Sequence, residues 1–223
     1  MYQNFQVIER AYTENGEIQL QKRGYDFEII FNGTFLMATY NGESEKLLVR
    51  WAIKEAYSPK RVLIGGLGVG FSLAEALNHK TIEKITVVEI ESKIIEWNSL
   101  YFSTYSNYAL NDPRVDVINA DFVDWILNSK EKYDVICLDI DNGPDWVVMD
   151  KNNTLYSHTG LFNLVKHINK SGVISFWSAS KSDNFERILK KHFNSIIVEE
   201  VSLKRGYPDY VYIAKNPKDF IKV

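Results

Sequence analysis

The chain has 223 residues, of which 45% are hydrophobic and 25% are charged, a balance typical of a globular protein. Its formal net charge is −3 without a long basic run, which argues against a nucleic-acid partner because phosphate binding needs clustered lysine and arginine. No apolar run approaches the roughly 20 residues that span a bilayer, and the first residues lack a secretion signal. We therefore expect a cytoplasmic protein with no membrane partner, whose lone cysteine, Cys137, is a buried thiol.

The first forty residues contain short runs of β-forming side chains, which are separated by Asn15-Gly16, Gly24 and Asn32-Gly33. An Asn-Gly pair between two such runs is a strong hairpin signal. We therefore expect a small N-terminal antiparallel β domain over residues 1–42, with strands at 5–12, 17–22, 25–31 and 34–38. A helical spacing of apolar side chains follows in residues 43–57, and Pro59 marks the end of that helix.

From residue 61 onward, predicted strands and helices alternate. The strands are expected at 61–65, 84–90, 114–119, 133–139, 171–177, 195–201 and 209–214, and the helices at 70–79, 91–102, 121–129, 158–169 and 181–192. Alternation of this kind indicates a parallel sheet with helices on both faces. The last two strands are joined by too few residues for a helical crossover, so they should form an antiparallel hairpin at the sheet edge. Residues 43–223 are therefore predicted to form a seven-stranded, doubly wound, Rossmann-like domain of the class I methyltransferase type.

A glycine-rich turn follows the first strand of this domain and contains Gly65, Gly66, Gly68 and Gly70. Glycine lets the backbone approach a nucleoside closely, because it has no Cβ and tolerates positive φ. Glu89 ends the next strand, near the spacing of about 20 residues expected for an acid that binds ribose hydroxyls. The pattern predicts a nucleoside-containing cofactor, although Glu89 could instead only cap the following helix.

Further acids stand at the ends of the next two strands. Ligands of open α/β sheets bind outside the carboxyl ends of the strands, so Asp121, Asp139 and Asp141 should share one edge. Asp121 is predicted to contact the adenine amino group, directly or through its neighbours, or to serve only as a helix N-cap. Asp139 follows an apolar run, where a carboxylate is costly unless it is partnered or lies in a cleft. We predict Asp139 and Asp141 as catalytic residues, and no metal site.

Together these residues resemble the spermidine synthase family of polyamine aminopropyltransferases, within the S-adenosylmethionine-dependent methyltransferase superfamily. The similarity covers nearly the whole chain and includes the glycine-rich turn, Val88-Glu89-Ile90, Asn111-Asp-Pro-Arg-Val115, Asn119-Ala-Asp121, and the Asp139 loop followed by Leu155-Tyr156. The resemblance implies that Glu89 binds the ribose, that Asp121 binds the adenine, and that Asp139 assists deprotonation of an attacking amine. Ile90 and Phe122 are predicted as further cofactor-binding residues. The resemblance also implies a small-molecule acceptor and an oligomer, for which we expect a homodimer.

The chain departs from this family in the glycine-rich turn, where aminopropyltransferases carry an aspartate and this chain has Gly68. That acid helps to bind the aminopropyl ammonium and would repel the carboxylate of intact S-adenosylmethionine by about 4 kcal/mol at close range. Because Gly68 removes the repulsion, we predict that intact S-adenosylmethionine fits and that the reaction is methyl transfer to a small amine-type acceptor. The substrate-binding residues are predicted to be Glu45, Asp141, Trp146, Tyr156 and Trp177.

Two alternatives to methyl transfer stay open. The first is aminopropyl transfer from decarboxylated S-adenosylmethionine to putrescine or another amine, which the acidic loop holding Asp139, Asp141, Asp145 and Asp150 would suit. The second, from another class, is an inactive nucleoside-binding protein that serves as an assembly partner. The presence of Glu89, Asp121 and Asp139 argues against that second alternative.

Overall fold

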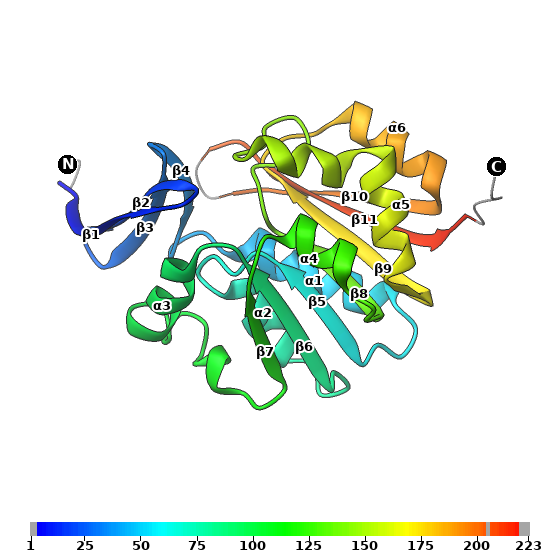
Figure 1. The fold of residues 1–223 in the computed structure, drawn as a ribbon, viewed down its shortest axis with the longest axis horizontal. Helices are drawn as coiled ribbons and strands as arrows, with labels where there is room; N and C mark the ends of the chain where they lie inside the picture. Colours follow the sequence, from blue (N-terminus) through cyan, green and yellow to red (C-terminus); the bar gives the residue numbers. More distant parts are fainter. Residues whose placement is uncertain (1–3, 204–205, 219–223) are drawn as a thin grey trace.

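A small antiparallel sheet opens the chain. The computed structural model describes residues 4–203 and 206–218, and the four strands of this sheet lie in the order β1-β2-β3-β4 (Figure 1). Their bounds are β1 Gln6–Thr13, β2 Gly16–Arg23, β3 Asp26–Phe31 and β4 Thr34–Ala38. The turn between β3 and β4 takes positive φ at Asn32 (47°) and Gly33 (76°), as the Asn-Gly signal predicts. The hairpins predicted for the start of the chain are confirmed.

A seven-stranded sheet forms the body of the molecule, in the order β10-β11-β9-β8-β5-β6-β7. Its strands are β5 Arg61–Gly65, β6 Lys84–Glu89, β7 Val115–Asn119, β8 Tyr133–Leu138, β9 Ile168–Ser178, β10 Phe193–Val201 and β11 Asp209–Pro217. The five strands from β9 to β7 are parallel, whereas β11 runs antiparallel to both β9 and β10. This is the predicted doubly wound fold with an antiparallel hairpin at one edge.

Six helices cover the two faces of this sheet (Figure 1). They are α1 Glu43–Glu55, α2 Phe71–Leu77, α3 Ser92–Leu100, α4 Phe122–Asn128, α5 His158–Lys166 and α6 Asp183–His192. Side chains alternate between the faces along each strand: Val62 and Ile64 pack with α1 to α3, whereas Leu63 packs with α4 to α6. Cys137 lies in the first of these clusters, as a buried thiol. Within the described residues, no helix is long and apolar enough to cross a membrane.

The start of β9 differs from the prediction. The helical pattern extended to residue 169, but α5 ends at Lys166 and β9 already begins at Ile168. Ile168 pairs with Tyr133 of β8 and is buried, so ladder hydrogen bonds and burial outweigh the helical periodicity there.

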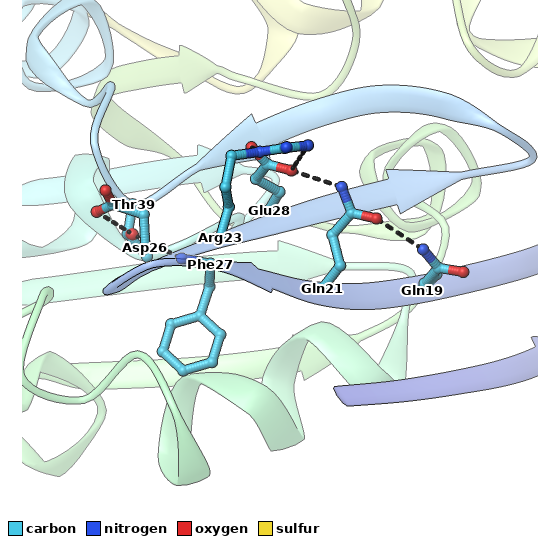
Figure 2. A network of polar contacts seen from close by, with 7 residues as sticks. All are labelled: Gln19, Gln21, Arg23, Asp26, Phe27, Glu28 and Thr39. Atoms are coloured by element: carbon cyan, nitrogen blue, oxygen red, sulfur yellow. Dashed lines mark hydrogen bonds and ion pairs between the residues drawn. The ribbon is translucent and has the colours of Figure 1, made fainter. Parts of the chain in front are cut away.

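The four-stranded sheet uses its two faces differently. Its apolar face carries Ile18, Leu20, Ile29 and Phe31, which belong to the same hydrophobic cluster as α1, α2 and α3. A chain of polar side chains also lies on this sheet: Gln19 donates to Gln21, Gln21 donates to Glu28, and Arg23 pairs with Glu28 (Figure 2). These amides are buried but hydrogen-bonded, so their burial is tolerated. The small sheet is thereby fixed against the larger one through a shared core.

Candidate active site

A cavity lies at the carboxyl ends of the parallel strands, where the four-stranded sheet meets the larger one. It encloses about 1000 Å³, open solvent at its mouth included. The four-stranded sheet contributes Ile29, Phe31, Leu36 and Met37 to its wall, and Glu45 comes from α1. The larger sheet and its loops contribute Gly66, Gly68, Val88, Glu89, Ile90, Glu91, Ile94, Asp121, Phe122, Asp139, Ile140, Asp141, Asn142, Val148, Met149, Asn152 and Trp177.

Two glycines of the glycine-rich turn lie where a residue with a side chain would not fit. Gly66 has φ of +88°, and a β-carbon there would lie 2.1 Å from the carbonyl oxygen of Asp139. Gly68 has φ of +51°, and a β-carbon there would lie 2.6 Å from the Sδ atom of Met37. Gly65 and Gly70 shape the same turn without lining the cavity. The turn therefore brings bare backbone to the cavity wall, as the sequence predicts for a nucleoside site.

Glu89 is held in place by backbone groups on both sides. Its Oε2 atom accepts the N–H of Leu67 at 2.8 Å, and its Oε1 atom accepts the N–H of Glu91 at 2.8 Å. A carboxylate has about four lone-pair sites, so Glu89 can still accept a hydroxyl group. Burial raises the pKa of Glu89. The geometry fits the predicted ribose ligand, and it joins the glycine-rich turn to the start of α3.

Glu91 is a cavity residue that the sequence analysis missed. It is buried, and its Oε1 atom accepts hydrogen bonds from Asn15 Nδ2 at 2.8 Å and Thr13 Oγ1 at 3.2 Å. Thr13 ends β1 and Asn15 lies in the β1–β2 turn, which the Asn-Gly pair predicts only as a hairpin. The turn thus contacts the cavity wall two residues after Glu89, a long-range relationship with no local signature in the sequence.

Asp121 is the N-cap of α4 and also reaches the cavity. Its side chain accepts the N–H of Asp124 at 3.1 Å as the N-cap of α4, and it also lines the cavity. Lys151 lies 3.0 Å from the other carboxylate oxygen. Ile90 and Phe122 line the same cavity, as expected. Contact of Asp121 with an adenine stays a prediction.

Asp139 and Glu45 are close together although they are far apart in the sequence. Ser72 of α2 donates to Asp139 Oδ2 at 3.0 Å, and the same hydroxyl lies 3.2 Å from the backbone oxygen of Glu45. Burial raises the pKa of Asp139 to about 7. Burial, and then the charge of Asp139, raise the pKa of Glu45 to about 8. Near neutral pH each of these carboxyl groups can therefore take up or release a proton, as a general base must.

Two polar neighbours of Glu45 were also missed. The hydroxyl of Ser44 lies 2.9 Å from Glu45 Oε2 and 2.6 Å from Asp209 Oδ2, at the start of β11. Glu45 and Asp209 are each only 5% exposed. Nothing in the local sequence indicates that the first residue of the last strand reaches α1, because only the antiparallel insertion of β11 beside β9 brings it there.

Asp141 has a structural role that its position in the sequence did not reveal. Its Oδ1 atom accepts the N–H of Val148 at 2.7 Å, which holds the loop after β8 against the cavity. Asn142, in the same loop, is 7% exposed, and its Nδ2 atom has no hydrogen-bond partner among the described residues. Val148, Met149 and Asn152 of this segment line the cavity. The catalytic role expected of Asp141 stays a prediction.

The three aromatic residues predicted to bind substrate lie in different surroundings. Trp177 lines the cavity. Trp146 is 58% exposed and lies outside it. Tyr156 is buried in the core on the other face, with its ring centroid 5.4 Å from that of Phe185. The structure therefore brings Trp177 to the cavity, whereas Trp146 and Tyr156, the latter at the end of the 3₁₀ segment Asp150–Tyr156, are not among its lining residues. Substrate binding by the three residues stays a prediction.

The charged residues that line the cavity all have the same sign. Its described lining residues include no lysine, arginine or histidine, and its acids are Glu45, Glu89, Glu91, Asp121, Asp139 and Asp141. A wall of this kind attracts cations and repels anions.

Strand order and the cavity at the carboxyl ends of the parallel strands define a class I methyltransferase-type α/β fold. Comparison with protein families matches residues 43–202 to the spermine/spermidine synthase domain, and the chain belongs to that family.

Curated relatives carry the name polyamine aminopropyltransferase. The protein of Thermococcus onnurineus (strain NA1) is 34% identical over 140 residues, which cover 60% of this chain and 49% of the relative. That of Saccharolobus solfataricus is 33% identical over 156 residues, which cover 70% of this chain and 50% of the relative. The chain thus matches about half the length of these relatives.

Two solved structures share the fold. A spermidine synthase in complex with the transition state analogue AdoDATO aligns with a TM-score of 0.79 and 20% identity, covering 94% of this chain and 73% of that one. The spermidine synthase from Thermotoga maritima aligns with a TM-score of 0.76 and 19% identity, covering 94% and 72%.

Proposed function

We propose that this chain transfers an aminopropyl group from decarboxylated S-adenosylmethionine to a small amine. Curated relatives support this proposal, since the two described above are named polyamine aminopropyltransferases. The observation that carries it is that every charged residue in the described lining of the cavity is an acid. A decarboxylated donor and an amine acceptor are both cations, so both are attracted to that wall.

The same charge disfavours intact S-adenosylmethionine. A ligand carboxylate near 4 Å from one unscreened acid costs about 4 kcal/mol at an effective dielectric of 20, and the described lining residues provide no basic group to offset it. Gly68 is also weaker support for methyl transfer than the sequence alone suggests. The space beside Gly68 is filled by Met37, whose sulfur would lie 2.6 Å from a β-carbon at that position. Aminopropyl transfer, the first alternative to methyl transfer, therefore becomes the main proposal.

Different residues of the cavity would have different roles in this reaction. The donor supplies an electrophilic carbon beside its sulfonium; as the amine nitrogen bonds to that carbon, the carbon–sulfur bond breaks and methylthioadenosine leaves. Glu89 would bind the ribose hydroxyls and Asp121 the adenine side of the nucleoside. Asp139, oriented by Ser72, would take a proton from the acceptor ammonium and so free its lone pair for attack. Glu45 would face the cationic acceptor.

The test is direct. The purified protein is incubated with putrescine and either decarboxylated or intact S-adenosylmethionine, and the products are identified by mass spectrometry. We expect an aminopropylated amine and methylthioadenosine from the first donor. The proposal fails if the first donor gives no product with any common diamine.

Methyl transfer is the second candidate, and Gly68 is the observation that favours it. A methylated amine formed from intact S-adenosylmethionine, with no aminopropylated product, would replace the first proposal by this one. Failure to bind either donor would favour an inactive assembly partner.

The expected division of the chain also belongs to this proposal. We assign residues 1–42 to the N-terminal β domain and residues 43–223 to the catalytic domain, although one hydrophobic cluster joins them. The homodimer and the cytoplasmic location expected from the sequence stay predictions. Analytical ultracentrifugation of the purified protein tests the homodimer.

A further inference from the structure

The hydroxyl of Ser44 lies between two buried carboxyl groups. Its Oγ atom is 2.9 Å from Glu45 Oε2 and 2.6 Å from Asp209 Oδ2, both within hydrogen-bond range. A serine hydroxyl carries a single hydrogen, so it can donate fully to only one of the two oxygens. The other contact becomes a hydrogen bond only if the carboxyl group itself carries a proton and donates it to Ser44.

We propose that Glu45, Ser44 and Asp209 together hold one extra proton, shared between the two carboxyl groups, and that the ammonium group of an acceptor amine displaces this proton when it binds against Glu45. Asp209 and Ser44 are then positioning residues, because they act on the acceptor through Glu45. This inference rests on the proposed function for its amine step, whereas the stored proton follows from the geometry of the protein alone.

The surroundings of this trio favour a stored proton. Asp139, at the end of β8, adds a third negative charge that raises the pKa of Glu45, after burial. Burial also raises the pKa of Asp209. The cation that follows on α1, Lys46, has its ammonium 5.1 Å from the centroid of the Phe71 ring.

Other charges between α1 and the elements packed against it are paired. Arg50 of α1 binds Glu75 of α2 at 2.8 Å, and Lys215 of β11 binds Glu55 at the end of α1. Because Arg50 and Lys215 are paired in this way, they do not neutralise the carboxyl groups of Glu45 and Asp209. A proton from solvent is therefore the counterion that the trio can take up, and a ligand cation beside Glu45 is the one that can replace it.

The exchange is balanced in charge. The carboxyl O–H releases its proton to solvent, the carboxyl becomes a carboxylate, and the ammonium cation lies beside it. No bond to carbon forms or breaks. Amine binding should therefore strengthen as pH rises through the range in which the trio loses its proton, because less work is needed to remove it.

The stored proton is tested without any ligand. A carboxyl group whose pKa is raised on folding stabilises the protein below its unfolded pKa and loses that contribution as pH rises through its folded value. The melting temperature should therefore fall as pH rises from about 5 to about 8, the folded pKa of Glu45. In Asp209→Asn the amide can donate to Ser44, and Ser44 can donate to an ionised Glu45, so no extra proton is needed and the fall should be smaller.

Matched variants make this test decisive. Asp116→Asn removes an acid that is 57% exposed on β7 and should keep the wild-type fall in melting temperature. Glu45→Gln removes the other half of the pair and should flatten the curve as Asp209→Asn does, which covers the case in which one variant does not fold. Equal curves for the wild type and both site variants would overturn the stored proton, whatever the protein's activity.

The displacement is measured by calorimetry with putrescine at pH 7, in buffers of different ionisation enthalpy, with methylthioadenosine filling the nucleoside region. We expect the wild type to release about one proton for each amine bound, and Asp209→Asn close to none. Amine binding without proton release would overturn the displacement. No amine binding, together with the expected melting curves, would leave the stored proton standing and would refute the proposed acceptor.

Discussion

The sulfur of Met37 covers Gly68. Its Sδ atom accepts the backbone N–H of Val69 at 3.0 Å, and a β-carbon on Gly68 would come within 2.6 Å of that sulfur. Strand β4 of the small sheet therefore closes over the glycine-rich turn of the large one. The space beside Gly68 is thus occupied by a thioether from another part of the chain.

This contact predicts coupling between the two positions. Gly68→Asp alone should lower the melting temperature and donor affinity, because it adds strain at positive φ of about 1–2 kcal/mol and collides with Met37. Adding Met37→Ala should restore part of the loss. A double-mutant cycle on melting temperature should give a favourable coupling of about 0.5–3 kcal/mol.

The same double variant should also discriminate better between donors. An acid at position 68 would face the donor once Met37 is shortened, so the affinity ratio of decarboxylated to intact S-adenosylmethionine should rise in Gly68→Asp/Met37→Ala. Strictly additive effects of the two substitutions would show that the sulfur does not restrict the turn.

Glu89→Gln should weaken donor binding by about 1.5–3 kcal/mol, the range for hydrogen bonds to a charged group. The side chain keeps its size, so the loss reports charge and acceptor capacity rather than an empty space. Titration calorimetry with methylthioadenosine measures it. Glu83→Gln, which alters a 65% exposed side chain, is the control and should bind normally. Unchanged affinity in Glu89→Gln would place the ribose elsewhere.

Asp139→Asn should lower turnover by about 10²–10⁴-fold, the usual contribution of a general base, while the melting temperature and donor affinity stay near those of the wild type. Product formation by mass spectrometry and binding by calorimetry separate the two effects. Asp116→Asn, far from the cavity on β7, should turn over normally. A fully active Asp139→Asn enzyme would remove this residue from the proton transfer.

The pH dependence of turnover should follow the same carboxyl group. Burial raises the pKa of Asp139 to about 7, and a base must be ionised to accept a proton, so the rate should rise with pH through that region. The plot of kcat/KM against pH for the unliganded enzyme checks this. A rate that is flat from pH 6 to 8 would contradict it.

Much of the fold could be predicted because local and periodic signals agree with it. Asn32-Gly33 takes the positive φ values that such a turn needs, and the alternation Val62, Leu63, Ile64 divides between two helical layers. The prediction is wrong at Ile168, where a long-range pairing with Tyr133 overrides a helical pattern. Sequence periodicity has no access to such pairings.

The candidate site likewise contains residues that the sequence could predict and residues that it could not. Glu89, Asp121 and Asp139 could be found because parallel strands place their carboxyl ends at one edge. Met37 and Asp209 could not, because they reach the site from the small sheet and from an antiparallel strand, at distances along the chain that carry no motif. Trp146 is exposed and Tyr156 is buried in the core, positions that the sequence does not distinguish because aromatic side chains serve cores and surfaces as readily as ligands.

Glu91 receives its hydrogen bonds from Asn15 and Thr13, in the bend that joins the first two strands. One residue of the cavity wall is therefore supported by a segment that lies about 76 positions earlier in the chain. A chimaera that carries the opening segment of a relative would exchange the donors to Glu91 while Glu89, Asp121 and Asp139 stay in place.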